Sequence, residues 1–525
     1  MGAKRGRELE TELKFELDAM GAKALGEHLK LASLGQQRKL RSVYYDTPET
    51  DLRDHGLTLR VRDDGKRRVQ TIKQSTLGGN GFHRGEWESL LERGVGGDLS
   101  PDLDAAARTP LGEILSRREL AFVRPVFEVE IKRITRSVEI EGAIIEIALD
   151  RGCARAEDRR AAIGEVELEL KAGPAQALFA LARECSGIAA LDLCFVSKAA
   201  RGYALLDDAP LAAAPAVDPR LRRGDTSGEA FRAIAGAALN QVAGNARVLK
   251  IARQPAALHQ LRVGVRRLRS AISLFAPMLA DEALAGVKAE LKWLAGQLDE
   301  ARDLDVFIQD IYQPALTREP EQIGLARFGE RLSAARERAY DQVGAAISVP
   351  RFRALMLATL SWIEAGDWCV SGDPVLAASR NRPIGAMAAE EFEQRRRKIV
   401  KKGRDLAAMA PADRHHLRIR VKRLRYACGF FASLYSGKAA KAHNAFATAA
   451  RDLQDSLGAL TDIAFSRDLV ARVAGLDGRP QDRLADAEQA FAAGALIGQA
   501  AAPTNRRLKA AAKAHRALRA AEAFW

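Results

Sequence analysis

A strict alternation of charged and apolar residues constrains the fold of the first 205 residues more than any other sequence feature. Residues 57–62 (LTLRVR) and 165–170 (EVELEL) repeat with a period of two, which is typical of β-strands because residues i and i+2 share a face. Turn signals such as Asp64-Gly65 separate such runs, and helical stretches such as residues 17–34 intervene. We therefore predict an antiparallel α+β domain that closes into a barrel.

The second part of the chain has another period and another charge. Residues 206–220 are rich in Ala and Pro and are predicted to form a linker. Beyond them, Ala-, Leu- and Arg-rich stretches with helical spacing continue to residue 525. Basic and acidic residues balance at 33 each in residues 1–205, so the whole excess of +14 lies in the second part. A field of one sign indicates a polyanionic partner such as nucleic acid, an anionic membrane or polyphosphate. The predicted domains are residues 1–205 and 221–525.

The helical part contains an internal repeat. Residues 258–269 (LHQLRVGVRRLR) recur as residues 414–425 (RHHLRIRVKRLR). A shorter echo follows each copy, at residues 298–303 and 457–462. Repetition of this length predicts two similar all-α helical bundles.

The charged faces of the predicted strands indicate chemistry inside the barrel. Glu10, Glu12 and Lys14 share a face, as do Arg60 and Arg62 and the three glutamates of residues 165–170. If the apolar faces are covered from outside, these charges meet in the lumen and must neutralise one another. Hard oxygen ligands suit Mg²⁺ or Mn²⁺ and fixed cations suit phosphate oxygens, so a metal-bound triphosphate would satisfy both sets. The alternative is that each strand is a solvated sheet edge with salt bridges.

An ordered series of motifs across this part resembles the CYTH family of triphosphate tunnel metalloenzymes. The series starts with Glu-x-Glu-x-Lys at residues 10–14 and continues with YYDTP (44–48), LRVR (59–62), TIK (71–73), RGEWE (84–88), ALD (148–150), EVELELK (165–171) and SK (197–198). The resemblance implies an eight-stranded tunnel that hydrolyses triphosphate with Mg²⁺ or Mn²⁺.

The same resemblance assigns roles to individual residues. The implied metal ligands are Glu10, Glu12, Asp150, Glu165, Glu167 and Glu169, with Glu86 as a further candidate. The implied substrate-binding residues are Lys14, Arg60, Arg62, Lys73, Arg133 and Lys198. The implied catalytic residues are Glu10, Glu12, Lys14 and Lys73.

One strand departs from the family pattern. Strict alternation places Arg133 beside Val129 and Ile131 on an apolar face, so that a β-bulge would be needed to turn it inward. Glu128 and Glu130 repeat the Glu-x-Glu-x-Lys pattern there, and their role stays open between structure and function.

Both helical repeats carry a basic stripe beside an apolar stripe. At 100° per residue, the stripe residues are His259, Arg262, Arg266 and Arg269 in the first copy and His415, Arg418, Lys422 and Arg425 in the second. Like charges at i and i+4 destabilise a helix. Because both repeats carry the same unfavourable stripe, the pattern indicates that a polyanion compensates the charge.

Four alternatives compete with that interpretation. The basic face could be merely solvated, His259 and His415 could be helix-terminal or core residues, and Asp303, Asp305 and Asp462 could form salt bridges with the arginines. Nucleic-acid binding is the fourth alternative. Against it, the domain has no aromatic platform for base stacking and no nucleic-acid motif.

The helical part resembles the CHAD family, the conserved-histidine α-helical domain. The matching motifs are HxxRVxxRRLR (259–269), RDLDV (302–306), HxLRIxxKxLRY (415–426) and LQxxLGxxxD (453–462). The resemblance implies two four-helix bundles around a basic groove or pore that binds inorganic polyphosphate through the stripe residues.

The combined prediction is metal-dependent hydrolysis of inorganic triphosphate, or of short-chain polyphosphate, in the tunnel of a chain whose CHAD domain holds polyphosphate. The rival hypotheses are an organic triphosphate hydrolase or cyclase, such as thiamine triphosphatase or adenylate cyclase, and a non-catalytic polyphosphate-binding protein. Scattered cysteines, a charged start and the lack of a long apolar run predict a cytoplasmic protein without a membrane partner, associated with polyphosphate granules.

Overall fold

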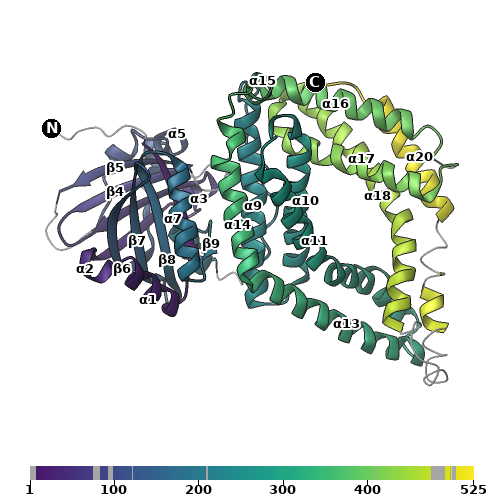
Figure 1. Cartoon of the computed structure of the whole chain (residues 1–525), viewed down its shortest axis with the longest axis horizontal. Coiled ribbons are helices and arrows are strands. Elements are labelled where there is room, and N and C mark those ends of the chain that lie inside the picture. Colours follow the sequence, from purple (N-terminus) through teal and green to yellow (C-terminus); the bar gives the residue numbers. More distant parts are fainter. Residues whose placement is uncertain are drawn as a thin grey trace. The chain divides into compact units, whose positions relative to one another are not determined.

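The computed structural model describes residues 8–74, 83–92, 99–120, 122–207, 211–406, 408–474, 491–496, 498 and 504–525 (Figure 1). The chain divides into two compact units. The first comprises Met1–Pro219, Ala235–Ile251 and Ser348–Val370, and the second comprises Arg220–Ile234, Ala252–Ile347 and Ser371–Trp525. Two helical segments beyond residue 220 therefore group with the first unit. The domain boundaries at residues 205 and 221 remain predictions.

One antiparallel sheet forms the centre of the first unit. Its strand order is β5-β4-β3-β2-β6-β7-β8-β1-β9, and a further pairing between β5 and β1 closes it into a ring. The predicted antiparallel barrel is therefore confirmed. The strands are β1 (Glu8–Glu16), β2 (Gln36–Asp46), β3 (Leu57–Asp63), β4 (Arg68–Gln74), β5 (His83–Leu91), β6 (Arg124–Ile140), β7 (Ala143–Ala156), β8 (Arg159–Ala172) and β9 (Asp192–Leu193).

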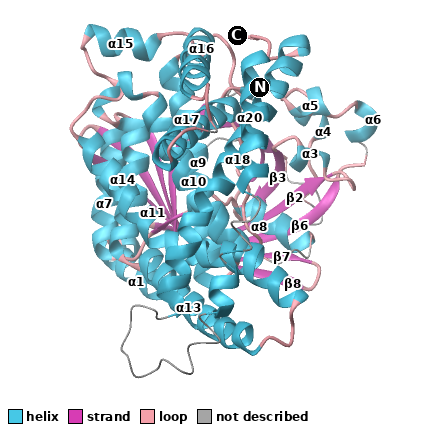
Figure 2. Ribbon diagram, turned by 90° about the vertical axis from the view of Figure 1, so that its right-hand side faces the viewer, coloured by secondary structure: helices cyan, strands magenta, loops and turns pink. Residues whose placement is uncertain are grey.

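Much of the outer face of the ring is apolar and covered by helices. Leu57, Leu59 and Val61 of β3 are fully buried and share one core with residues of four short helices, which gather beside β2 and β3 in Figure 2. Helices α1, α2 and α7 pack on β6, β7 and β8. The period of two thus sends every second residue outward into these cores and the next one inward. The helices are α1 (Ala19–His28), α2 (Leu31–Leu34), α3 (Asp51–Asp54), α4 (Leu103–Ala106), α5 (Leu111–Ile114), α6 (Arg117–Leu120) and α7 (Ala175–Ile188).

Helix α8 (Lys198–Leu206) packs on the inner face of the ring. Its Ala199 and Tyr203 share a core with Phe127 of β6. Gly202 permits this approach, because a Cβ atom there would lie 2.1 Å from Phe127 Cδ2. The Ser197 hydroxyl caps the helix by accepting a hydrogen bond from the Ala200 amide. Part of the inner face is therefore apolar, and it becomes charged at the N-terminal end of α8.

The second half of the chain is helical, as predicted. Helices α10 and α17 carry the two copies of the sequence repeat, and each is followed by a short 3₁₀-helix (Ala276–Met278 and Ala432–Leu434) and then by a long helix. The repeat in sequence is therefore also a repeat in local structure, while the division into four-helix bundles stays a prediction. The helices are α9 (Ser227–Ile251), α10 (Pro255–Leu274), α11 (Ala283–Phe307), α12 (Gln313–Arg318), α13 (Ile323–Ser348), α14 (Pro350–Ala365), α15 (Pro374–Asn381), α16 (Ile384–Lys402), α17 (Pro411–Phe430), α18 (Gly437–Ala474) and α20 (Thr504–Ala520).

Within the described residues, no single helix is both long and apolar enough to cross a membrane. One bent pair, Gly324–Ser348 with Pro350–Cys369, meets the length and composition criteria together.

Candidate functional site

The strand register sets the charged faces of β1 and β8 against each other. Lys14 lies opposite Glu167, and Glu12 lies opposite Glu169. Both β1 side chains are buried, at 4% and 8% exposure, and they alternate with Leu13 in the outer core. This placement agrees with the predicted inward orientation. The side chain of Glu10 lies outside the described part of the structure.

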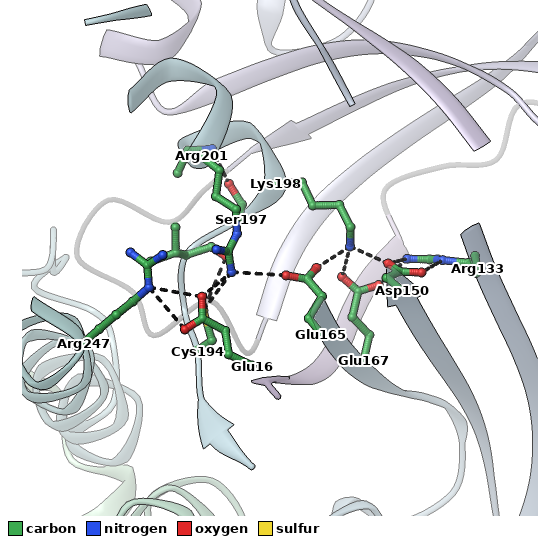
Figure 3. A network of polar contacts seen from close by, with 12 residues as sticks. Glu16, Arg133, Asp150, Glu165, Glu167, Cys194, Ser197, Lys198, Arg201 and Arg247 are labelled. Atoms are coloured by element: carbon green, nitrogen blue, oxygen red, sulfur yellow. Dashed lines mark hydrogen bonds and ion pairs between the residues drawn. The ribbon is translucent and has the colours of Figure 1, made fainter. Parts of the chain in front are cut away.

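Three carboxylates and one ammonium group form the acidic cluster at the centre of the site (Figure 3). Carboxylate oxygens of Asp150, Glu165 and Glu167 lie within 4.8 Å of one another. Lys198 Nζ lies 2.7 Å from Asp150 Oδ2 and 2.8 Å from Glu167 Oε1. It also contacts Glu165 Oε1. The start of α8 thus delivers a cation into the acidic cluster.

Arg133 joins this cluster without a bulge. The register of β6 and β7 runs without a shift from Glu128 to Ile140, so Arg133 does share a face with Val129 and Ile131. Its guanidinium group donates to Asp150 Oδ1 at 2.7 Å, to Asp150 Oδ2 at 2.6 Å and to Glu167 Oε2 at 2.5 Å. The expectation that this apolar face is the outer one was therefore wrong. Val129 and Ile131 face inward because α8 covers them there.

Mutual pairing keeps these buried groups ionised. Burial alone would raise the pKa of Glu167, but Lys198, Arg133 and Lys14 lower it well below its ordinary value. Burial would likewise raise the pKa of Asp150, and Lys198 and Arg133 lower it. Against the effect of burial, the carboxylates of Glu167, Asp150 and Glu165 raise the pKa of Lys198. At neutral pH Asp150, Glu167 and Lys198 are thus fixed charges.

Two buried arginines of β3 extend the site, and the charges of Tyr44, Glu86 and Glu88 raise the pKa of the first, Arg60, against the effect of burial. Arg60 donates to Thr71 Oγ1 at 3.2 Å, and Arg62 Nε donates to Ser42 Oγ at 3.4 Å. Neither guanidinium group forms an ion pair with a carboxylate of the described residues. Burial and the guanidinium groups of Arg60 and Arg133 lower the pKa of Arg62 to about 9. Because a buried charge without a counter-charge is costly, these arginines indicate an anion site.

Lys73 lies on the same inner face as Thr71. Its ammonium group is 3.2 Å from Glu86 Oε1 on the neighbouring strand, and the Thr71 hydroxyl donates to Glu88 Oε1 at 3.2 Å. Lys73 is therefore placed beside Arg60 but carries its own acidic partner.

The predicted metal ligands divide into two groups. Asp150, Glu165 and Glu167 form the acidic cluster, while Glu12 and Glu169 are neighbours across β1 and β8 and, among the side chains described, are not part of it. Glu169 also lies 2.5 Å from Lys171 Nζ. The cluster fits a hard divalent cation in ligand type and spacing. A bound ion would share these oxygens with the ammonium group of Lys198.

The polar network continues through residues that the motifs did not single out. Arg201 Nη2 donates to Glu16 Oε1 at 2.5 Å and lies 3.4 Å from Glu165 Oε2. Arg247 Nε, on the part of α9 that belongs to the first unit, donates to both Glu16 oxygens at 3.1 and 3.2 Å (Figure 3). Glu16 continues the alternation of Glu12 and Lys14, and Arg201 lies one helical turn after Lys198, so the sequence held a signal for both. It held none for Arg247, whose partner is remote in the chain.

Glu128 and Glu130 lie outside this network. They form ion pairs with Arg41 at 2.6 Å and with Arg155 at 3.4 Å, and their side chains are 38% and 46% exposed. These contacts favour the structural alternative, as surface salt bridges on the outer face of β6.

Basic residues of both repeats converge in the second unit. Lys422 is surrounded by Arg262 and Arg266 of α10 and by Arg418 and Arg425 of α17. Burial and these four arginines lower its pKa to about 7. Arg266 Nε is buried and has no hydrogen-bond partner in the part of the chain that the structure describes. A cluster of cations that repel one another indicates a surface for a polyanion.

Acidic groups lie beside Arg262 of the first repeat. Arg262 lies 2.9 Å from Asp299 Oδ1 and 3.5 Å from Asp303 Oδ1. In the second repeat the position of Asp299 is taken by Gly458, where a Cβ atom would lie 3.5 Å from Arg418 Nε. Asp305 accepts hydrogen bonds from Arg336 and Tyr340, each at 2.7 Å. Asp303 therefore forms a salt bridge with a stripe arginine, the predicted alternative to metal binding, whereas Asp305 pairs with Arg336 outside the stripe. The side chain of Asp462 is outside the described part.

The remaining stripe residues are less central. Burial and the neighbouring Arg302, Arg266 and Arg262 lower the pKa of His259 to about 4, so it is neutral at pH 7. Arg269 and His415 are exposed to solvent.

An antiparallel barrel that encloses charged side chains, followed by a helical part with two basic repeat helices, defines a protein of two joined domain types. Family models match residues 8–203 as a CYTH domain and residues 233–471 as a CHAD domain. The chain therefore carries one CYTH domain and one CHAD domain.

Known proteins resemble parts of the chain. The inorganic triphosphatase of Haemophilus influenzae is 26% identical over 200 residues, which span 37% of this chain and 54% of that protein. The chain thus spans about half the length of this curated relative. The crystal structure of the CHAD domain from the plant Ricinus communis is 26% identical and covers 59% of this chain and 99% of its own, with a TM-score of 0.49. PptA from Streptomyces chartreusis is 17% identical and covers 56% of this chain and 100% of its own, with a TM-score of 0.41.

Proposed function

We propose that the barrel hydrolyses inorganic triphosphate or short-chain polyphosphate with Mg²⁺ or Mn²⁺, and that the helical domain binds polyphosphate. The observation that carries the first part is the pair Arg60 and Arg62, two inward guanidinium groups beside the acidic cluster that form no ion pair with a carboxylate of the described residues. Such a pair matches the repeated oxygens of a phosphate chain. The curated relative, an inorganic triphosphatase, supports the same substrate class.

In this proposal the chain's own residues bind and orient the substrate. Arg60, Arg62 and Lys73 hold the phosphate oxygens and neutralise their charge, while Asp150, Glu165 and Glu167 hold a divalent ion. When bound, that ion supplies Lewis-acid polarisation of a phosphoryl oxygen. Water attacks the terminal phosphorus in line, the P–O bond to the bridging oxygen breaks, and orthophosphate and diphosphate leave. Asp150 and Glu167 stay ionised, so their role is to hold cations in place.

The basic residues of the second unit support the polyphosphate part of the proposal. Arg262, Arg266, Arg418 and Lys422 come from two repeats, and the three arginines lie close enough to Lys422 to lower its pKa. A chain of phosphates offers regularly spaced anions along one dimension, which fits two adjacent basic helices better than an isolated anion does.

Phosphate release from tripolyphosphate, ATP and thiamine triphosphate, with Mg²⁺ or Mn²⁺, tests the catalytic part. We expect tripolyphosphate to be the preferred substrate. Arg62→Gln should lower kcat/KM by about 100-fold, as the loss of one preorganised electrostatic contact does. Lys132→Gln, at an exposed position of β6, is the matched control. If the wild-type protein releases phosphate from none of the three substrates, the proposal that it is a triphosphatase is wrong.

A further inference from the structure

The contacts of Arg247 connect a helix of the second family match to the acidic cluster. Residue 247 lies within the CHAD match, yet Ala235–Ile251 of α9 belong to the first compact unit. Arg247 holds both oxygens of Glu16, and Glu16 shares one of them with Arg201. We propose that Arg247 is a positioning residue for Lys198 that acts through Glu16, Arg201 and Glu165. This inference rests on the proposed triphosphate site.

The distances show how one ion pair can affect the next. Arg201 is closer to Glu16, at 2.5 Å, than to Glu165, at 3.4 Å. Glu16 therefore holds Arg201 back from Glu165, whose other oxygen contacts Lys198. If Glu16 turns away, Arg201 closes on Glu165 and competes with the ammonium group of Lys198. Arg247 prevents this by fixing Glu16 from the other side.

The network is balanced in charge. Its cations are Arg133, Lys198, Arg201 and Arg247, and its anions are Glu16, Asp150, Glu165 and Glu167. Removal of Arg247 therefore leaves a net negative charge and a displaced Lys198 where an anionic substrate binds. Both changes weaken substrate binding more than they slow the chemical step.

The chain offers a matched control on the same helix. Lys250 forms a second ion pair between α9 and the strands of the first unit, with Asp192 Oδ1 at 2.6 Å. The side chains of Lys250 and Arg247 are 23% and 30% exposed. Loss of the Lys250 pair removes a similar anchor and the same unit of charge. Asp192 lies opposite Glu16 in the pairing of β9 with β1, but among the described residues its side chain forms no ion pair with a cation of the Lys198 network.

The experiment compares Arg247→Gln, Arg247→Lys and Lys250→Gln in the full chain. Steady-state hydrolysis of tripolyphosphate gives kcat and KM, and calorimetric titration with tripolyphosphate in EDTA gives Kd without turnover. We expect Arg247→Gln to raise KM and Kd about tenfold with kcat within about twofold of wild type. Arg247→Lys should restore most of the affinity because it returns a cation to Glu16. Lys250→Gln should stay close to wild type.

Two results would overturn the inference. One is an equal rise of KM and Kd in Arg247→Gln and Lys250→Gln, which would mean that both residues only anchor α9. The other is an unchanged KM and Kd in Arg247→Gln. Failure of the proposed function is a separate outcome, because it shows as absent phosphate release by the wild type while the titrations still compare the variants.

Discussion

Arg133 and Asp150 lie directly opposite each other on β6 and β7, and the guanidinium group donates to both oxygens of the carboxylate, at 2.7 and 2.6 Å. Asp150 is fully buried. The pair therefore has a structural role in addition to any role in binding substrate.

Removal of Arg133 should destabilise the barrel. Arg133→Gln leaves a buried carboxylate with Lys198 alone, and breaking such a pair costs about 3 to 5 kcal/mol. Urea unfolding, followed through the transition of the first unit, measures the loss. Lys132→Gln changes the adjacent exposed residue of the same strand and should leave the transition in place. Equal midpoints for the two variants would contradict the prediction.

The acidic cluster should make the free energy of unfolding fall both at acidic pH and at strongly alkaline pH. The pKa of Glu167 is lowered in the folded protein, so its stabilisation is present above about pH 4.5, its ordinary value, and is lost as the pH falls through the folded-state value. The pKa of Lys198 is raised, so its stabilisation is present below about pH 10.5 and is lost as the pH rises through the folded-state value. Between these limits the contribution of the cluster is constant.

Glu167→Gln tests the acid side of this dependence. Without the carboxylate, the free energy of unfolding should fall less steeply below pH 4.5 than it does in the wild type. The exposed Glu139 provides the control, and Glu139→Gln should keep the wild-type slope. Parallel curves for wild type and Glu167→Gln would show that the cluster does not control acid unfolding.

Polyphosphate binding should weaken as the pH rises. Burial and four neighbouring arginines lower the pKa of Lys422 to about 7, and a bound polyanion favours the charged ammonium form. Binding therefore takes up a proton above pH 7, and Kd should rise by up to about tenfold per pH unit. Lys422→Arg, which stays protonated, should flatten the dependence, and Lys438→Arg at an exposed site should not. Titrations between pH 6 and 9 check this, and an unchanged slope in Lys422→Arg would refute it.

The glycine beside Arg418 gives a further test. Gly458→Asp places a carboxylate beside Arg418 as Asp299 lies beside Arg262. The new pair should weaken polyphosphate binding about fivefold, or about 1 kcal/mol, the upper value for a partly exposed pair. Gly286→Asp adds the same charge at an exposed position of α11 where nothing lies within 4 Å. If Gly458→Asp and Gly286→Asp bind polyphosphate equally well, pairing of the new carboxylate with Arg418 does not determine the affinity.

The alternation of charged and apolar residues in the sequence was enough to predict much of the barrel site. It turned Glu12 and Lys14 inward, and it put Arg60 and Arg62 on one face opposite an apolar core. For Arg133 the period was correct but the face was misjudged, because the apolar cover inside the ring is a helix from a distant part of the chain. Arg247 could not be found from sequence, since only the tertiary fold brings α9 beside Glu16.

The helical spacing of basic residues also predicted which of them would lie together on each repeat helix. It grouped Arg262 with Arg266 and Arg418 with Lys422, and the packing of α10 on α17 brings the two pairs together. Spacing could not tell that Arg269 and His415 are exposed, because solvent access depends on which helices pack alongside.

Helix α14 belongs to the first compact unit, and this matters for any attempt to express the CYTH domain as a separate fragment. Phe352 and Met356 of α14 are buried, and this helix packs on α7 and β9. A fragment that stops at residue 220 would lose that cover together with Arg247, and it would leave an apolar patch prone to aggregation. Dividing the chain between the two domains is thus a poor way to assign an activity to each of them. Single substitutions in the intact polypeptide are the better method.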